Sequence, residues 1–185
     1  MGTLTYGMIT SLDGYVTRPD GSFDFFEPDD ELHAFINERE RHTGTYVYGR
    51  RMWETMRFWQ NPPELANPVH RDYATLWRAA DKVVVSRGLT DVGGLPRTDL
   101  WTAFDPDRLR ELVAASPNQV TIPGPDLAGQ VLRAGLVDRV EAYVVPYVNG
   151  GGTPLLPLGY AASLALREEQ RFASGVVLLT YDVLR

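Results

Sequence analysis

The chain has 185 residues, of which 44% are hydrophobic and 23% are charged, the ordinary balance of a soluble globular domain. Its net charge of −6 and its lack of cysteine exclude a basic nucleic-acid-binding surface, a disulfide scaffold and a thiolate site. No apolar run reaches the roughly 18 residues of a membrane span, and the start lacks the features of a secretory signal. We therefore expect one cytoplasmic domain over residues 1–185 that binds neither nucleic acid nor membrane.

The first half of the chain is predicted to alternate strands with helices. An apolar run at residues 4–9 predicts a strand. The segment Pro28-Asp29-Asp30-Glu31, with its acidic residues, predicts the start of a helix that continues through residue 39. A second strand is expected at 45–48, followed by a helix at 50–56, an irregular proline-rich segment at 58–68 and a helix at 72–80. The valine-rich run at 82–86 is typical of a buried strand.

The second half continues the alternation and ends in a hairpin. A short strand is expected around Trp101, then a helix that opens at Asp105-Pro106. A strand at 119–122, a helix at 127–134 and a strand at 139–147 follow. Residues 164–172 and 176–184 flank a turn and predict a terminal β-hairpin. The alternation indicates an α/β fold, with a mostly parallel sheet, helices on both faces and an antiparallel C-terminal hairpin.

Three predicted strand ends carry groups suited to phosphate. In such a sheet, ligands bind beyond the carboxyl ends of the strands. The three segments are Gly49-Arg50-Arg51, Ser86-Arg87 and Pro123-Gly124-Pro125-Asp126-Leu127. Each alone is also compatible with an ordinary turn, but their occurrence at successive strand ends predicts a dinucleotide site. Neither G-x-G-x-x-G nor G-x-x-x-x-G-K-[ST] is present, so an ordinary Rossmann fingerprint and a P-loop are not supported.

Candidate acid–base and pocket residues lie near the first strand and helix. Asp13 follows the first strand and is the candidate catalytic carboxylate, with an Asx-turn at Gly14 as the alternative role. Glu31 is a candidate substrate ligand or simply a complement to the helix dipole. Trp59, in the proline-rich segment, is a candidate pocket wall. The histidines show no metal-ligand spacing, so no metal site is predicted; they are His33, His42 and His70.

The order of several motifs resembles a known family. The segments are MITSLDGYV at 8–16, YGRRMWE at 48–54 and KVVVSR at 82–87. They resemble the dihydrofolate reductase-like family, in particular the bacterial proteins related to the C-terminal reductase domain of riboflavin biosynthesis. The runs at 135–140, 145–147 and 150–156 are similar to that family as well, so the resemblance covers nearly the whole chain.

The resemblance implies a mixed sheet of about eight strands and a bound NADPH. The residues that it places at the adenosine 2′-phosphate are Gly49, Arg50, Arg51, Ser86 and Arg87. Those that it places along the pyrophosphate or nicotinamide ribose are Pro123, Gly124, Asp126 and Leu127. It places Asp13, Gly14 and Val16 on the nicotinamide and substrate side. The candidate substrate-binding residues are Tyr15, Glu31 and Trp59.

The expected function is an NADPH-dependent reductase that transfers a hydride to a small heterocycle of the pterin or ribosylaminopyrimidine type. A riboflavin-pathway reductase acting on a 5-amino-6-(ribosylamino)uracil is one alternative, and a non-catalytic nucleotide-binding protein is another. The resemblance also implies a homodimer. The chain departs from the family at Met52, where threonine is frequent, and at Pro123 and Pro125, where many members carry glycines. The two prolines remove two N–H donors.

Overall fold

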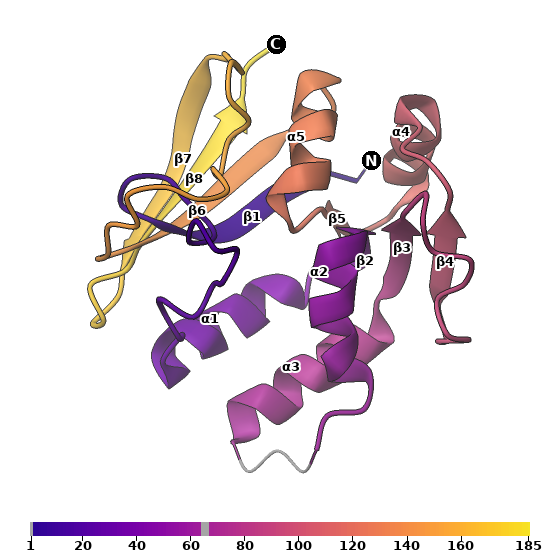
Figure 1. Cartoon of the computed structure of the whole chain (residues 1–185), viewed down its shortest axis with the longest axis horizontal. Coiled ribbons are helices and arrows are strands. Elements are labelled where there is room, and N and C mark those ends of the chain that lie inside the picture. Colours follow the sequence, from indigo (N-terminus) through magenta and orange to yellow (C-terminus); the bar gives the residue numbers. More distant parts are fainter. Residues whose placement is uncertain (1, 64–66) are drawn as a thin grey trace.

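A computed structural model describes residues 2–63 and 67–185 and contains one sheet of eight strands in the order β4-β3-β2-β5-β1-β6-β8-β7 (Figure 1). The strands are β1 (Leu4–Ser11), β2 (Thr43–Gly49), β3 (Asp81–Val85), β4 (Thr98–Trp101), β5 (Gln119–Thr121), β6 (Arg139–Val145), β7 (Leu164–Arg171) and β8 (Val177–Val183). The helices are α1 (Asp30–Glu40), α2 (Arg50–Met56), α3 (Pro68–Ala79), α4 (Pro106–Ala115) and α5 (Pro125–Arg133), with a 3₁₀ turn, η1 (Arg57–Gln60).

The sheet is mostly parallel. Strands β1 to β6 pair in parallel, whereas β8 pairs antiparallel with both β6 and β7. The mixed sheet with a C-terminal antiparallel hairpin confirms the predicted fold class. Because β3, β2, β5 and β1 are consecutive neighbours, their carboxyl ends meet along one edge.

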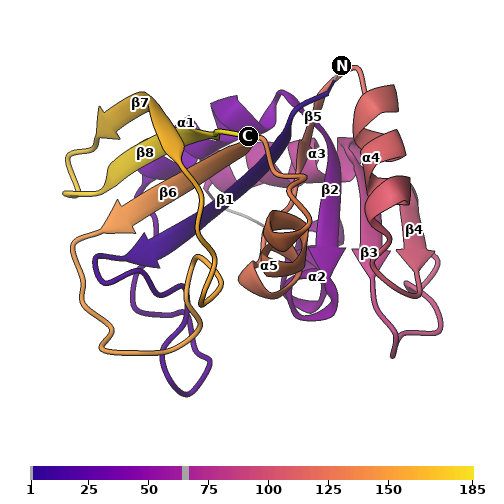
Figure 2. The same ribbon diagram turned by 90° about the horizontal axis from the view of Figure 1, so that it is seen from above.

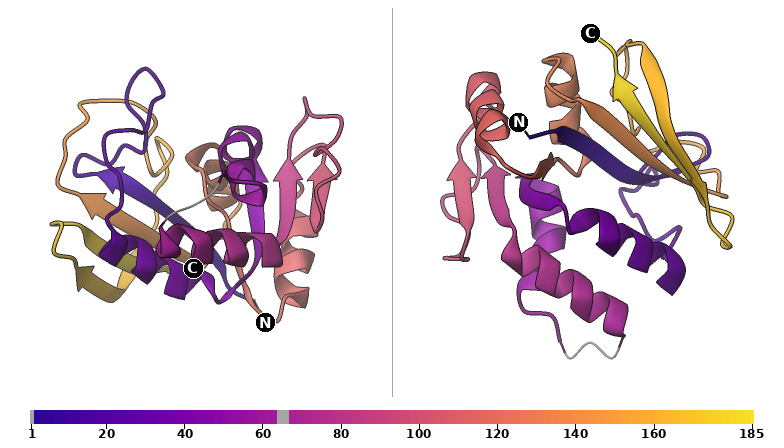
Figure 3. Two further views of the ribbon diagram at one scale, coloured as in Figure 1. Left: turned by 90° about the horizontal axis from the view of Figure 1, so that it is seen from below. Right: turned by 180° about the vertical axis from the view of Figure 1, so that it is seen from behind.

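Helices cover both faces of the sheet, as Figures 2 and 3 show. On one face, α4 and α5 pack on a core that includes Val47 and Val83. On the other face, α2 and α3 bury Trp53 and Trp77 against the tyrosines of β2. Helix α1 adds Leu32 to a third cluster, over β6 and the hairpin. The alternation of side chains along each strand therefore supplies both cores, which is why the central strands are apolar throughout.

Several element boundaries differ from the sequence prediction. Helix α3 begins at Pro68, inside the segment predicted as irregular, because Asn67 accepts a hydrogen bond from Val69 N and proline suits the first helical turn. Strand β6 ends at Val145, before Pro146, and α5 begins at Pro125. Residues 64–66 of the predicted irregular segment lie outside the described residues. None of the described helices is long and apolar enough to cross a membrane.

The single lysine of the chain is buried beneath α3. Lys82 is 2% exposed, and its Nζ donates to the carbonyl oxygens of Ala80 at 2.8 Å and Arg78 at 3.3 Å. The ammonium also lies 4.3 Å from the ring centroid of Trp77. These contacts satisfy carbonyls at the C-terminal end of α3. Burial is the main cause that lowers the pKa of Lys82 to about 8.

This lowered pKa predicts a pH-dependent stability. Between about pH 8 and pH 10.5 the unfolded chain keeps the lysine proton while the folded chain loses it, so the Lys82 contribution to stability increases as pH rises. We expect the wild type to gain about 1–3 kcal/mol relative to Lys82→Met across this window. Urea unfolding of both proteins at a series of pH values measures the difference, and a pH-independent difference would contradict the prediction.

Candidate functional site

A large cleft of about 1580 Å³ opens at the carboxyl ends of the central strands. Its outer part is lined by the segment after β1, the start of α2 and the β5–α5 junction. Its inner part extends between α1 and the sheet to Tyr46 and Glu141. The predicted site residues that line it are Val16, Gly49, Arg50, Arg51, Pro123, Gly124, Asp126 and Leu127. The structure thus brings two of the three predicted phosphate segments directly into one cleft.

The start of α2 places two arginines at the mouth of the cleft. Arg50 Nε donates to Glu54 at 2.8 Å, and Arg51 Nη1 donates to Asp126 at 3.1 Å. The Arg50 and Arg51 side chains are 57% and 85% exposed, so these ion pairs are weakly held. Both guanidinium groups can therefore leave their carboxylate partners and bind an anion that carries more negative charge than a carboxylate.

The turn after β3 lies next to Arg50, although none of the residues of this turn is among those that line the cleft. A Cβ on Gly88 would lie 3.3 Å from Arg50 Nη1, so this guanidinium packs over the turn after β3. Ser86 Oγ accepts from the N–H groups of Gly88 and Leu89, which fixes the turn. Arg87 is exposed on the same turn. The ends of β2 and β3 therefore form one polar surface, with Ser86 in a turn-stabilising position.

The β5–α5 junction packs closely against α2 and leaves the start of α5 uncapped. Gly124 has φ +101°, a conformation that favours glycine, and a Cβ there would lie 3.1 Å from the Met52 Cβ. Helix α5 has no side-chain N-cap and begins with Pro125, so the N–H groups of Asp126 and Leu127 belong to the helix start without an intrahelical partner. Met52, the departure from the family pattern, packs against this glycine.

These groups fit a phosphorylated dinucleotide. Two exposed arginines suit a phosphate monoester, and the uncapped start of α5 suits a pyrophosphate. The Asp126 carboxylate would repel an anion at the start of α5, but Arg51 forms an ion pair with Asp126 and offsets the negative charge of this carboxylate. The donor set of the cleft is therefore compatible with the NADPH that the sequence predicts.

Asp13 lies outside the cleft lining and holds two loops together. Its Oδ1 accepts from Ser11 Oγ at 2.7 Å and from the N–H of Asn149 at 2.9 Å, and its Oδ2 accepts from the N–H of Gly150 at 2.7 Å. The hydrogen bond from Ser11 is the main cause that lowers the pKa of Asp13 to about 2. These contacts favour a structural role for the ionised Asp13 carboxylate. This role differs from the predicted Asx-turn, because the donors belong to Ser11, Asn149 and Gly150. Its catalytic role stays a prediction.

The loop after β1 and the glycine-rich loop after β6 run alongside each other at the cleft. Val16 N donates to Thr153 O and Leu155 N to Gly14 O, each at 2.8 Å, and Tyr15 forms a bridge with Pro154. Gly14 and Tyr15 therefore belong to the loop framework, while Val16 lines the cleft. The two loops form one wall of the cleft.

Two predicted substrate ligands do not line this cleft. Glu31 Oε2 accepts from Ala173 N at 3.1 Å, so its side chain holds the β7–β8 turn. Trp59 packs edge-on against Tyr73 with ring centroids 4.8 Å apart, and it also contacts His70. Neither residue is among those that line the cleft. Their contacts with a substrate remain predictions.

The inner part of the cleft contains polar residues that sequence reasoning missed. Arg39 and Glu40 come from the last turn of α1, and Glu141 comes from the middle of β6. A charged residue at 141 inside the apolar run of residues 140–145 was the available signal. The sequence predicts a helix that continues through Arg39, but nothing in the sequence indicates that the last turn of this helix faces the sheet.

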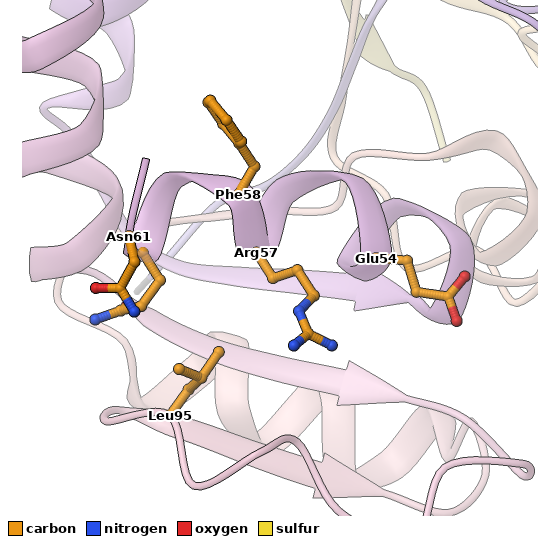
Figure 4. Close-up of a pocket in the computed structure, with 6 residues that line it drawn as sticks. Glu54, Arg57, Phe58, Asn61 and Leu95 are labelled. Atoms are coloured by element: carbon orange, nitrogen blue, oxygen red, sulfur yellow. The ribbon is translucent and has the colours of Figure 1, made fainter. Parts of the chain in front are cut away.

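A smaller hollow of about 310 Å³ lies beside the α2–η1 segment. Figure 4 shows Glu54 and Arg57 along this segment, Leu95 across from them and Phe58 pointing the other way. The residues that line the hollow are Glu54, Arg57, Phe58, Gln60, Asn61 and Leu95. None of them is a predicted site residue, so the large cleft is the candidate site.

Known structures show that the fold is dihydrofolate reductase-like. A protein assigned to riboflavin biosynthesis from Shewanella sp. PV-4 has a TM-score of 0.77 at 20% identity, with 99% of each chain covered. A pyrimidine reductase-like protein from Corynebacterium diphtheriae has a TM-score of 0.73 at 17% identity, covering 100% of this chain and 92% of that one. Dihydrofolate reductase from Enterococcus faecalis, in complex with NADP(H) and RAB-propyl, has a TM-score of 0.67 at 14% identity, covering 100% and 98%.

The family of the chain follows from its sequence. The model of the RibD C-terminal domain matches residues 2–178, and the chain belongs to that family. No curated protein matches the chain. The family and the fold confirm the resemblance that the motifs after β1, β2 and β3 carry.

Proposed function

We propose that the chain is an NADPH-dependent reductase that transfers a hydride to a small nitrogen heterocycle. The observation that carries this proposal is the convergence of Arg50, Arg51 and the uncapped start of α5 at one edge of the sheet. Membership of the RibD C-terminal domain family supports a reductase of the riboflavin-pathway type. The cofactor in the Enterococcus faecalis structure supports a nicotinamide nucleotide.

Each part of the cleft has a role in this proposal. Arg50 and Arg51 bind the 2′-phosphate, with the Ser86–Arg87 turn beside them, and the start of α5 faces the pyrophosphate. Val16 and the loop wall exclude water from the nicotinamide side. When bound, NADPH supplies the hydride, while the protein supplies position and electrostatics. Asp13 is assigned to the support of the loop wall.

The substrate alternatives are a pterin-like and a ribosylaminopyrimidine-like ring. A non-catalytic nucleotide-binding protein is the second candidate. The observation that favours it is the pair of prolines around Gly124, which removes two N–H donors from the junction. A homodimer remains a prediction of the family resemblance, and a cytoplasmic location remains a prediction from composition.

Arg50→Ala tests the assignment of the 2′-phosphate. A lost hydrogen bond to a charged group costs about 1.5–3 kcal/mol, so we expect NADPH affinity to fall by that amount and NADH affinity to stay nearly unchanged. Arg87→Ala is expected to act in the same direction. Calorimetric titration of each variant with both nucleotides measures the effect.

Arg57→Ala is the matched control, because Arg57 follows Arg50 by two helical turns and lines the smaller hollow instead. It should leave both affinities unchanged. An equal loss of NADPH and NADH affinity in Arg50→Ala would contradict the assignment of the 2′-phosphate to the start of α2.

A further inference from the structure

Two histidines that are far apart in the sequence meet between α1 and α3. His33 lies on α1 and His70 lies on α3, and these two helices pack side by side (Figure 1). The two imidazole rings have centroids 4.8 Å apart, and their planes are inclined by 42°. Both residues are half-buried, so solvent still reaches the pair. Neither histidine is among the residues that line the large cleft, so the pair is separate from the candidate nucleotide site.

A buried amide determines which nitrogen of His33 is free. Asn37 is 1% exposed and lies one helical turn after His33. Its Nδ2 donates to the carbonyl oxygen of Val69 and to the carboxylate of Asp72, each at 2.9 Å. Because only the NH₂ end of an amide can donate, these two acceptors fix the Asn37 Oδ1 on the side of His33. The Oδ1 lies 3.2 Å from His33 Nδ1, so Nδ1 carries the proton of the neutral ring and Nε2 carries the lone pair.

This arrangement is typical of an imidazole that binds a metal ion. In metal sites, one ring nitrogen of a histidine donates to a fixed oxygen, which orients the ring, and the other nitrogen binds the ion. Asn37 Oδ1 is such an oxygen for His33. Asn37 is itself held by Val69 and Asp72, so the orientation of the ring is set from two residues of α3.

The separation of the two rings fits one shared ion. Two imidazoles that bind the same ion at about 2.1 Å from each nitrogen, at nearly a right angle, have ring centroids about 5 Å apart. The observed separation of 4.8 Å agrees with this value. Imidazole nitrogens favour Zn²⁺, Ni²⁺ and Cu²⁺, whereas Mg²⁺ and Ca²⁺ prefer oxygen ligands. The donor set therefore indicates a late first-row divalent ion.

The surroundings hold both rings and supply negative charge. Trp59 packs edge-on against both histidines, and Tyr73 packs edge-on against His33 with ring centroids 5.7 Å apart. Asp30, one turn before His33 on α1, places a negative charge close enough to act on this ring. In the part of the chain that the structure describes, no third histidine or carboxylate completes a three-ligand group. Water therefore fills the other positions of the ion, which makes it exchangeable.

We propose that His33 and His70 together bind one divalent transition-metal ion, which cross-links α1 to α3. His33 binds the ion through Nε2. Because the unfolded chain does not hold the two rings together, the ion binds the folded chain preferentially and stabilises it. The inference does not depend on the proposed reductase function, since the pair lies outside the large cleft.

Calorimetric titration of the untagged wild-type chain with ZnCl₂ tests the site. The chain must be untagged because a histidine tag would bind the ion, and a buffer at about pH 7.5 keeps an ordinary imidazole neutral. We expect one Zn²⁺ ion per chain and no binding of MgCl₂ under the same conditions. Saturating Zn²⁺ should also raise the Tm by several degrees.

Variants of the three histidines assign the ligands. His33→Ala and His70→Ala each remove one ligand, so each should lower Zn²⁺ affinity by about tenfold or more and abolish the rise in Tm. His42→Ala is the matched control, since His42 is exposed and lies between α1 and β2. This control should bind one Zn²⁺ ion with unchanged affinity and show the same rise in Tm as the wild type.

A spectrum of the wild type keeps the inference testable if a variant does not fold. With one equivalent of CuCl₂, the electron paramagnetic resonance spectrum should show coupling to two imidazole nitrogens. Coupling to fewer than two nitrogens would overturn the inference. So would a wild type that binds no Zn²⁺, a His33→Ala or His70→Ala variant that binds Zn²⁺ as tightly as the wild type, or an equal loss of affinity in His42→Ala.

Discussion

Gly152→Ala is expected to cost about 3–5 kcal/mol of stability, corresponding to a fall in Tm of roughly 6–20 °C. Gly152 has φ +122°, and a Cβ there would lie 1.8 Å from the carbonyl oxygen of Thr17. The clashing atoms belong to the backbone of the neighbouring loop, so no rotamer change relieves them. One of the two loops must move instead.

The loop contacts show what this movement removes. Thr153 N donates to Thr17 Oγ1 at 3.1 Å, Asn149 Nδ2 donates to Thr17 O at 3.0 Å, and Val16 N donates to Thr153 O at 2.8 Å. These hydrogen bonds hold one wall of the cleft. We therefore expect Gly152→Ala to weaken nucleotide binding as well as stability.

Gly150→Ala is the matched control for this prediction. Gly150 also has a positive φ, +74°, but a Cβ there meets nothing within 4 Å. Its substitution should cost only about 1 kcal/mol of backbone strain. Thermal unfolding of both variants distinguishes the cost of backbone strain from the cost of the collision with Thr17. Equal losses of stability in the two variants would contradict the predicted clash.

Gly124→Val is expected to lower NADPH affinity by about 100-fold or more and to cost about 2–4 kcal/mol of stability. A β-branched side chain strains the backbone at φ +101° and collides with Met52, whose Cβ lies 3.1 Å from the Cβ position. The side chain also fills the approach to the start of α5. The sequence alone predicts only a small loss of stability here, because it does not reveal the contact with Met52.

Gly135→Ala provides the control at the opposite end of α5. Gly135 has φ +66° with open space around its Cβ position, so substitution strains the backbone far from the α5 N-terminus. The Gly135→Ala variant should be less stable than the wild type and should bind NADPH with unchanged affinity. If Gly124→Val binds NADPH as tightly as the wild type, the cofactor does not lie along the β5–α5 junction.

The fold was largely predictable because its signals are local. The valine-rich run of β3, the proline at the start of α4 and the alternation of strands with helices require no knowledge of distant contacts. Pro68 was harder, since it lies in a proline-rich segment yet begins a helix that Asn67 caps.

The candidate site was predictable only in part. Arg50 and Gly124 could be placed because parallel strands end along one edge. Asp13 could not be distinguished as a loop support, since its partners Asn149 and Gly150 lie far along the chain. The inner part of the cleft around Glu40 depends on how α1 packs over β2 and β6, a tertiary contact that no local pattern specifies.

Direct titration of the purified wild-type chain with NADPH and NADH tests the central claim most directly. Arg50 and Arg51 at the mouth of the cleft predict that NADPH binds and that it binds about tenfold or more tightly than NADH, because NADH lacks the 2′-phosphate. Nucleotide fluorescence or calorimetry measures both affinities under the same salt conditions. Equal affinities, or no binding of NADPH, would contradict the account.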